Sequence, residues 1–240
     1  MPLPETDFDI TEVALPWRLF RDAGLQVVFA TPSGRGAPRC DPLLIEGPIF
    51  GMLGARPENL AHYRSLERDP AFCRPLAFAA LEPEAYDALV LPGGHAPGMR
   101  PYLEDGVLQG VVARFSGLGR PIGAICHGTL VLARCRGPDG HSLIAGRTMT
   151  CLPAWMELSA WALTAWKLGR YYRTYDQTVQ AEVKAALGRT GTLRIGPPHN
   201  RYDRPFVVRD GNLVSARWPG DAQAFAAAVL ELLGEGRAGG

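Results

Sequence analysis

Short apolar runs alternate along this chain with segments of helical periodicity, and that alternation restricts the fold more than any other feature of the sequence. The apolar runs predict strands at residues 25–30, 86–91, 121–126, 147–151, 206–209 and 213–216. The periodic segments predict helices at residues 11–23, 102–115, 129–135, 155–168, 175–187 and 222–233. Strands and helices in this order favour the α/β class, with a mostly parallel sheet covered by helices on both faces.

Turn and cap residues mark several of these boundaries. Gly24 is suited to end the first helix, whereas Pro16 lies inside that helix and suggests that its regular part begins only there. The Asp-Gly-Asn sequence at 210–212 predicts the turn of a hairpin. Asp221 is a candidate N-cap for the last helix.

The length and apolar content fit one domain. With 240 residues, 47% of them hydrophobic, we expect a single domain at 1–233 and a flexible tail at 234–240. Residues 35–83 are the least periodic and hold much of the Pro and Arg. They predict a small insertion over one edge of the sheet or over the functional site.

Charge and cysteine content exclude several kinds of protein. The formal net charge is +1 and no basic run occurs, so neither nucleic acid nor a membrane is expected as a partner. No apolar stretch approaches the ~20 residues that span a bilayer, and the first residues lack the pattern of a signal peptide. The 5 cysteines, irregularly spaced, predict free thiols. Free thiols and the lack of a signal peptide predict a cytoplasmic protein. Because neither CxxC nor HExxH occurs and the histidines are scattered, no metal site is expected.

Residues 123–128, Gly-Ala-Ile-Cys-His-Gly, have the properties of a nucleophile elbow, a sharp turn from a strand into a helix. Small residues are needed two before and two after the nucleophile because strand and helix approach closely there, and Ala124 and Gly128 meet that need. Cys126 would then lie near a helix N-terminus, whose dipole favours the thiolate. The alternative is a buried core cysteine, since cysteine is among the most buried residue types.

Two further features favour the catalytic interpretation of Cys126. Gly93 and Gly94 follow the expected strand 86–91, and their backbone N–H groups could face a developing oxyanion, although an ordinary loop would also contain such glycines. Glu12, early in the first helix, could have a raised pKa beside a thiolate and donate a hydrogen bond to it. On its own, Glu12 would be explained as well by the dipole of its helix.

Taken together, these segments resemble the ThiJ/PfpI superfamily. The resemblance covers most of the chain and rests on Glu12 before Pro16, the segment 86–94, the Cys-His elbow and the segment 210–217. It implies a flavodoxin-like three-layer sandwich, Cys126 as the nucleophile and Glu12 as the acid beside it. It also implies a homodimer and no cofactor.

The branches of this superfamily differ in their third catalytic residue. Glutamine amidotransferases use a late His-x-Glu, whereas the late His199 of this chain is followed by Asn200 and Arg201. The PfpI-type peptidases use a glutamate shortly after the paired glycines, where this chain has Gly98. Both of those triads are therefore in doubt.

The branch of heat-shock glyoxalase III enzymes and chaperones matches the chain better. It shares His95 after the glycines and an insertion like that at 61–75, and it takes an acid roughly thirty residues after the histidine of the elbow. Glu157 stands at that distance from His127, so the resemblance implies a Cys126–His127–Glu157 triad in which Glu157 orients the imidazole. A helix acid in the first turn would explain Glu157 equally well.

This branch implies a glutathione-independent glyoxalase or a related deglycase, acting on small reactive aldehydes such as methylglyoxal in a stress response. In the implied reaction Cys126 adds to the aldehyde, Glu12 and His127 move a proton, and hydrolysis releases a 2-hydroxy acid. Gly93, Gly94 and His95 would bind the substrate or its oxyanion.

Two other functions remain open at this point. A holdase chaperone would use an exposed apolar patch, for which Trp155, Trp161 and Trp166 are candidates, although a buried helix face would produce the same pattern. The same fold also hosts amidase-like and peptidase-like hydrolases, so fold alone does not choose between them.

The start of the chain departs from the pattern of the superfamily. Relatives have a full strand before the segment that corresponds to 7–9, whereas only residues 1–6 precede it here. We expect a shortened first strand, or a start codon placed too late. A shortened strand loses ladder bonds and core contacts.

Overall fold

The computed structural model describes residues 1–49 and 53–238. Its strands are β1 (Thr6–Phe8), β2 (Ala30–Thr31), β3 (Arg39–Cys40), β4 (Leu76–Ala77), β5 (Leu89–Leu91), β6 (Ile122–Ile125), β7 (Thr148–Met149), β8 (Thr192–Leu193), β9 (Val207–Asp210) and β10 (Leu213–Ala216). Its helices are α1 (Ile10–Asp22), α2 (Leu43–Glu46), α3 (Pro57–Leu66), α4 (Pro70–Cys73), α5 (Arg100–Glu104), α6 (Gly106–Ser116), α7 (Thr129–Arg134), α8 (Ala154–Leu168), α9 (Val179–Leu187) and α10 (Ala222–Ala238).

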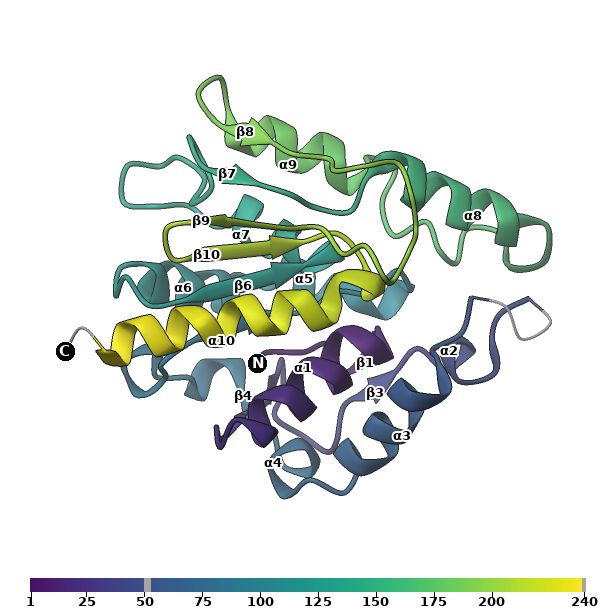
Figure 1. Cartoon of the computed structure of the whole chain (residues 1–240), viewed down its shortest axis with the longest axis horizontal. Helices are drawn as coiled ribbons and strands as arrows, with labels where there is room; N and C mark the ends of the chain where they lie inside the picture. Colours follow the sequence, from purple (N-terminus) through teal and green to yellow (C-terminus); the bar gives the residue numbers. More distant parts are fainter. Residues whose placement is uncertain (50–52, 239–240) are drawn as a thin grey trace.

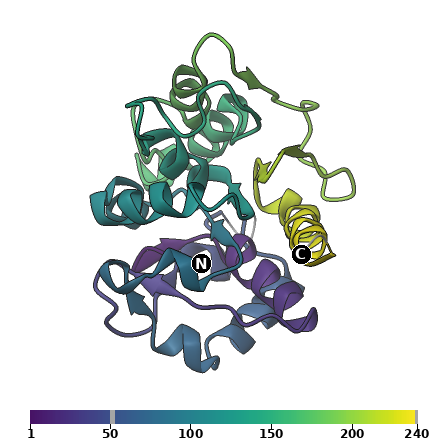
Figure 2. The same cartoon turned by 90° about the vertical axis from the view of Figure 1, so that its left-hand side faces the viewer.

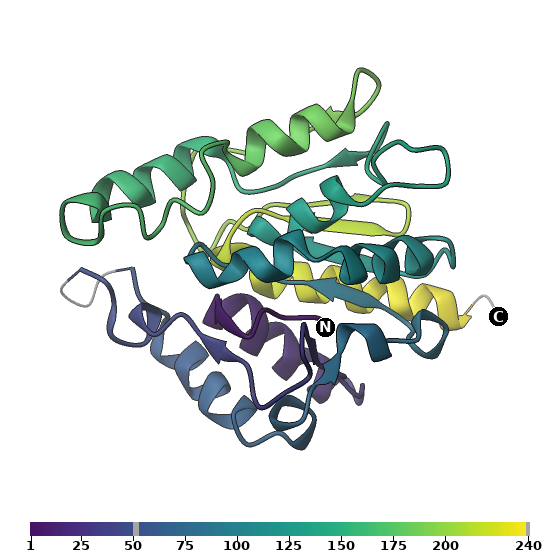
Figure 3. The same ribbon diagram turned by 180° about the vertical axis from the view of Figure 1, so that it is seen from behind.

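A sheet in the order β5-β6-β10-β9 forms the centre of the molecule. Strands β5, β6 and β10 run parallel, and β9 runs antiparallel to β10 at the edge. Helix α10 crosses one face of this sheet and packs against α1, whereas α5, α6 and α7 cover the other face (Figures 1 and 3). These three layers confirm the expected α/β sandwich with a mostly parallel sheet.

Three parallel pairs of strands flank the central sheet in the described part of the chain: β1-β3, β2-β4 and β7-β8. The backbone N–H of Asp9 donates to the carbonyl of Gly93 at 2.9 Å and so joins the end of β1 to the loop after β5. On the other side, the N–H of Thr150 donates to Oγ of Ser215 at 2.9 Å. Seen from the side, the purple and blue N-terminal part and the green segment with α8 and α9 lie at opposite ends of the molecule (Figure 2).

The first strand is short, as the sequence predicts. β1 has 3 residues, and the segment before it meets β2 separately, where Pro2 pairs with Ala30. The hairpin β9–β10 is also confirmed. Gly211 has a φ of 56° in its turn, a conformation that glycine adopts without steric cost.

Helix α1 begins at Ile10 and runs through Pro16, so the expectation that its regular part starts only at the proline is wrong. The reason is the N-cap: Oδ1 of Asp9 accepts hydrogen bonds from the N–H groups of Thr11 and Glu12 at 2.8 and 3.0 Å. These bonds fix the first turn before the chain reaches the proline. Gly24 follows the C-terminal end with a φ of 78°, as expected.

The segment expected as an insertion, 35–83, includes residues 50–52, which lie outside the described residues. The rest of it supplies β3, β4 and the helices α2 to α4, with α3 packed against α1. Nδ2 of Asn59 donates to Oγ1 of Thr11 at 3.2 Å, and the buried ring of Tyr63 meets Phe8 edge-on. This segment therefore covers the side of β1 and α1.

Several elements have other bounds than the sequence predicts. Of the run 25–30 only the end is a strand, and the helix expected at 102–115 is two helices because Asp105 caps the second one through a 2.7 Å bond to the N–H of Leu108. Helix α10 continues beyond its expected end at 233. Arg209 on β9 forms an ion pair with Glu235, which ties these last turns to the sheet.

The aromatic side chains of α8 are more exposed than a buried helix face would be. Trp155 is 39% exposed and Trp166 is 68% exposed, with Leu163 between them at 58%. The buried positions of α8 are instead Met156, Glu157 and Thr164. Among the described residues no helix is long and apolar enough to cross a membrane.

Candidate active site

Cys126 lies at the carboxyl end of β6, in a turn that the sequence predicts as an elbow. Its φ is 55°, a left-handed conformation that is rare for a residue with a side chain and is typical of strained functional turns. Gly128 is required here, since a Cβ on it would collide with the carbonyl oxygen of Leu91 on β5. Oγ1 of Thr129 donates to the carbonyl of Cys126 at 2.7 Å and holds the turn at the start of α7.

Two other elements bring Glu12 to this elbow. Oε2 of Glu12, in the first turn of α1, accepts a hydrogen bond from the N–H of Gly93 at 2.8 Å. A Cβ on Gly93 would lie 2.7 Å from the backbone nitrogen of His127 and 3.0 Å from Cβ of Cys126, so only glycine fits between the two loops. The carboxyl group also interacts with the thiol of Cys126. The structure thus places the predicted acid and the predicted nucleophile side by side.

The same contact changes the role expected of Gly93. Its N–H was expected to face an oxyanion, but it is used by Glu12. Gly94 packs against the first strand, where a Cβ would lie 2.7 Å from the carbonyl oxygen of Asp7 and 2.9 Å from Sδ of Met99. Both glycines are therefore needed for close backbone approach.

Two histidines face the thiol. Nε2 of His95 and Nδ1 of His127 each lie 3.6 Å from Sγ of Cys126, and the two rings meet edge-on with their centres 4.8 Å apart. His95 follows the glycines after β5, and His127 follows Cys126 after β6. Because β5 and β6 are parallel neighbours, their carboxyl ends bring both imidazoles to one edge of the sheet.

Burial controls the protonation of these groups. It raises the pKa of Glu12 well above its ordinary value, and the nearby charge of Asp9 raises this pKa further. It lowers the pKa of His95 to about 4 and that of His127 well below its ordinary value, so both rings are neutral at pH 7. A neutral carboxyl group can donate a proton, and a neutral imidazole can accept one.

The pKa of Cys126 differs from the sequence expectation. The helix N-terminus was expected to favour the thiolate, but burial raises the pKa of this thiol, and the negative charges of Glu12 and Asp9 add to the rise. Burial outweighs the dipole because the side chain is 0% exposed. When Glu12 carries a proton its repulsion disappears, so thiolate formation is coupled to that carboxyl group.

Glu157 does not make the contact that a Cys126–His127–Glu157 triad requires. Its Oε1 accepts from Nη1 of Arg173 at 2.8 Å, and its Oε2 accepts from the N–H of Val179 at 2.9 Å. Nε2 of His127, which Glu157 was expected to orient, is buried without a hydrogen-bond partner in the described part of the chain. Both oxygens of Glu157 are thus engaged by the segment that leads into α9.

That segment, residues 170–176, contacts His95, which faces the thiol, and we call it the covering segment. Oγ1 of Thr174 donates to the carbonyl of His95 at 2.6 Å, and the ring of Tyr172 lies edge-on to the imidazole of His95. Tyr171 and Tyr172 both donate to Asp41, at 3.0 and 2.9 Å. Sequence reasoning missed these residues because no motif marks them. Asp9, by contrast, could have been found as a cap residue directly before a helix.

Gly98 lies where a peptidase of this superfamily would carry its glutamate. Its N–H donates to Oδ2 of Asp7 at 2.7 Å, and a Cβ at this position would lie 2.7 Å from the same oxygen. A side chain at Gly98 would therefore displace the side chains of Thr6 and Asp7.

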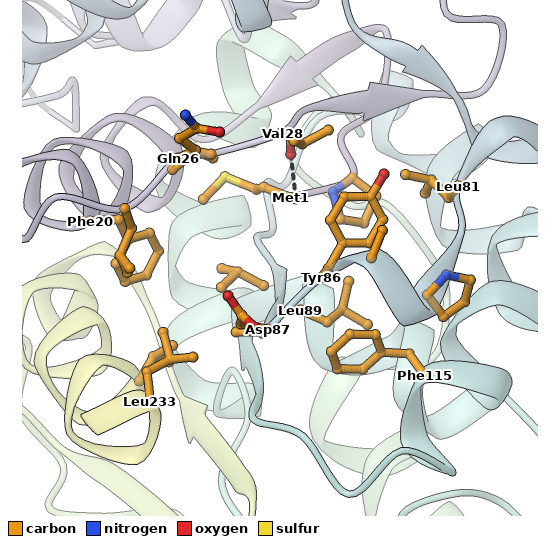
Figure 4. Close-up of a pocket in the computed structure, with 18 of the residues that line it drawn as sticks. Met1, Phe20, Gln26, Val28, Leu81, Tyr86, Asp87, Leu89, Phe115 and Leu233 are labelled. Carbon is orange, nitrogen blue, oxygen red and sulfur yellow. Dashed lines mark hydrogen bonds between the residues drawn. The ribbon is translucent and has the colours of Figure 1, made fainter. Parts of the chain in front are cut away.

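A cavity of ≈ 470 Å³ opens at the amino ends of the strands, away from the thiol. Its walls include Phe20, Tyr86, Leu89 and Phe115, with Asp87 among them (Figure 4). Cys126 follows the opposite, carboxyl end of β6 and is not part of this lining. The chemistry described above therefore belongs to the buried cluster at the elbow rather than to this cavity.

Comparisons with known proteins identify the family of this chain. A family model described as ThiJ/PfpI family-like matches residues 3–202. Protein DJ-1 homolog D from Arabidopsis thaliana is 27% identical over 224 residues, which are 93% of this chain and 44% of that protein. The chain thus spans less than half the length of that relative. Deglycase PfpI from Pyrococcus furiosus is 29% identical over 158 residues, which are 66% of this chain and 69% of that protein.

The fold is shared with solved structures. The crystal structure of glyoxalase III from Candida albicans matches with a TM-score of 0.72 at 20% identity, and the match covers 96% of this chain and 95% of that chain. At this level of identity the likeness shows the common architecture.

Proposed function

The chain belongs to the ThiJ/PfpI family, and on that premise we propose that it is a cysteine-dependent enzyme of small reactive aldehydes, acting as a glutathione-independent glyoxalase or a related deglycase. The observation that carries the proposal is the contact of Cys126, at a left-handed elbow, with a carboxyl group of raised pKa and two neutral imidazoles. The relatives named deglycases support the same class of reaction.

Burial favours a small substrate over a peptide. Cys126 is 0% exposed and His127 is 1% exposed, whereas His95 is partly exposed. A two- or three-carbon aldehyde can reach the thiol by a small displacement of His95 or Tyr172. A peptide would have to displace the whole segment 170–176. Gly98, which has no carboxyl group where a peptidase of this family would carry its glutamate, also speaks against a peptidase triad.

The first step is the addition of Cys126 to the aldehyde carbon. Sulfur forms a bond to this carbon, and the carbonyl oxygen takes the proton that the thiol gives up, with His95 or His127 as the carrier. The product is a hemithioacetal. The N–H of Gly94 and the imidazole of His95 are the groups we assign to the developing oxyanion, since Glu12 uses the N–H of Gly93.

The second step converts the hemithioacetal of methylglyoxal into a thioester. The neutral His127 removes the proton from the carbon bound to sulfur, and the protonated Glu12 gives its proton to the neighbouring carbon, so that the ketone becomes an alcohol and the aldehyde carbon becomes the thioester carbonyl. The proton on His127 then passes back to Glu12, which returns both groups to their starting states. Water then cleaves the thioester and releases lactate and the free thiol. No electrons leave the substrate, and neither glutathione nor a redox partner is consumed.

The test is lactate formation from methylglyoxal without glutathione, compared between the natural sequence and Cys126→Ala. We expect the variant to form no lactate above the uncatalysed rate. The matched control is Cys73→Ala, because Cys73 is a free, partly buried thiol on α4, away from the elbow. Equal activity in the natural sequence and Cys126→Ala would remove the proposal.

The exposed face of α8 supports a second candidate, a holdase chaperone. This helix exposes the large apolar side chains of Trp155, Leu163 and Trp166. Exposed apolar patches mark surfaces that bind other proteins, such as unfolded clients. An aggregation assay with a thermally unfolded client separates the two functions. A chaperone should keep its protection of the client in Cys126→Ala and lose it in Leu163→Ser/Trp166→Ser. An enzyme should lose lactate formation in Cys126→Ala and keep it in Leu163→Ser/Trp166→Ser.

A further inference from the structure

His95, Cys126 and His127 place three metal-ligating atoms in one small cluster, although they come from two different loops. Nε2 of His95, Sγ of Cys126 and Nδ1 of His127 all lie within 4.8 Å of one another. The sequence predicts no metal site, because the spacing of the histidines resembles no zinc motif. The parallel pairing of β5 and β6 brings the three together in spite of that spacing.

We propose that His95, Cys126 and His127 bind one Zn²⁺ ion, and that this ion reversibly switches off the thiol. The binding part of this inference stands on the cluster alone. The inhibitory part rests on the function proposed above, because it needs Cys126 to be the nucleophile.

The spacing of the ligand atoms suits a tetrahedral zinc ion. With Zn–S near 2.3 Å and Zn–N near 2.0–2.1 Å, tetrahedral angles place sulfur and nitrogen about 3.6 Å apart and two nitrogens about 3.4 Å apart. Both sulfur–nitrogen distances in the structure are 3.6 Å. Only the two imidazoles have to approach each other, and His95, which lies on the loop after β5, is the less buried of the two.

The chemistry of the three ligands also suits zinc. Thiolate and imidazole are the ligands that zinc prefers, and three protein ligands leave the fourth position for water or a small anion. The ion displaces one proton, that of the Cys126 thiol, and the resulting site carries one net positive charge from Zn²⁺ and one thiolate. The carboxyl group of Glu12 interacts with Cys126, and its Oε1 is buried without a hydrogen-bond partner among the described residues.

Zinc binding would block the proposed reaction directly. The lone pair of the thiolate that would attack the aldehyde is then shared with the metal. Nε2 of His95 and Nδ1 of His127, the ring nitrogens that face the thiol, are no longer free to carry protons. Chelation restores all three groups. A cell with excess free zinc would therefore hold this enzyme inactive without oxidising its cysteine.

The experiment measures metal binding without substrate. The full chain, first treated with EDTA and then freed of it, is titrated with Co²⁺ and with Zn²⁺. We expect one ion per chain, with a thiolate-to-cobalt charge-transfer band in the near ultraviolet that Zn²⁺ removes. Cys126→Ser should lose the band, and His95→Ala should weaken Zn²⁺ binding by more than the roughly 10-fold cost of losing an outer-shell contact.

The controls are Cys73→Ser and His141→Ala, a free thiol and an exposed histidine far from the cluster, and both should bind as the natural sequence does. Circular dichroism shows that each variant is folded; if His95→Ala is not, His95→Gln takes its place. Zinc binding that persists unchanged in Cys126→Ser or in the His95 variant overturns the inference.

A final arm adds Zn²⁺ to the lactate assay. Because binding is read from cobalt spectra and zinc titration, a chain that binds zinc but forms no lactate contradicts only the proposed enzyme function. A chain that forms lactate at the same rate with and without stoichiometric Zn²⁺ contradicts only the proposed switch.

Discussion

Nη1 of Arg173 lies 2.8 Å from Oε1 of Glu157, and these side chains are only 11% and 1% exposed. Arg173 directly precedes Thr174, whose hydroxyl donates to the carbonyl of His95. Since the other oxygen of Glu157 accepts from Val179 at the start of α9, this carboxylate holds the covering segment at Arg173 and again just after its end. Glu157 is thus tied to the covering segment rather than to the imidazole of His127.

This contact predicts the behaviour of Glu157→Gln. Removing the charge leaves Arg173 nearly buried without a counter-ion, so we expect the free energy of unfolding to fall by about 3 kcal/mol. Lactate formation should fall as well, because the covering segment loses its anchor. Urea denaturation and the lactate assay measure the two effects.

The double variant Glu157→Gln/Arg173→Met distinguishes an anchor from a triad member. If Glu157 acts through Arg173, removal of both partners should recover most of the lost stability and much of the lost activity. If instead Glu157 orients His127 directly, activity should stay as low in the double variant as in the single one.

Alanine substitutions at two glycines, one in the elbow and one in α6, should change the stability of the chain in opposite directions. Gly128→Ala would press a Cβ into the carbonyl of Leu91, so we expect a loss of several kcal/mol of stability or an unfolded chain. Gly110→Ala, inside α6, meets nothing within 4 Å and should stabilise the chain by about 0.5–1 kcal/mol. Thermal unfolding of both variants checks this. Equal tolerance of the two changes would mean that the elbow is not packed against β5 in this way.

Asp9 predicts a pH dependence of stability. Burial raises the pKa of Asp9 from 3.8 to about 6, so between these values the folded chain holds a proton that the unfolded chain has lost. Stability from this group is fully present below pH 3.8 and is lost as the pH rises through about 6, by up to about 3 kcal/mol. Asp9→Asn, which keeps a cap oxygen, should therefore gain stability relative to the natural sequence as the pH rises from 4 to 7.

Urea denaturation at several pH values measures this difference. The matched control is Asp105→Asn, which makes the same change at the half-buried N-cap of α6. It measures how an Asp-to-Asn change affects stability at a less buried helix start. A stability difference between Asp9→Asn and the natural sequence that does not grow between pH 4 and 7 would contradict the prediction.

Much of this molecule could be predicted from local sequence. The order of strands and helices, the elbow around Cys126 and the hairpin turn at Gly211 all follow from short-range patterns, and the structure contains each of them. Glu12 was also assigned correctly to the neighbourhood of the thiol, because the resemblance to a family carried information about distant segments.

Long-range contacts account for what sequence reasoning missed. The ion pair of Glu157 with Arg173 and the bonds of Tyr172 to Asp41 join segments whose spacing follows no periodic rule. The raised pKa of Cys126 depends on complete burial, which a helix-dipole argument does not contain. The expectation that the regular part of α1 begins only at Pro16 is wrong for a local reason, the cap by Asp9, which the sequence also holds.

The most direct test of the central claim is the initial rate of glutathione-free lactate formation from methylglyoxal, measured side by side for the natural sequence, Cys126→Ala and Glu12→Gln. We expect Cys126→Ala to lose roughly 10³-fold or more and Glu12→Gln to lose about 10²–10⁴-fold, because one removes the nucleophile and the other its proton carrier. A Cys126→Ala variant that forms lactate as fast as the natural sequence would contradict the account.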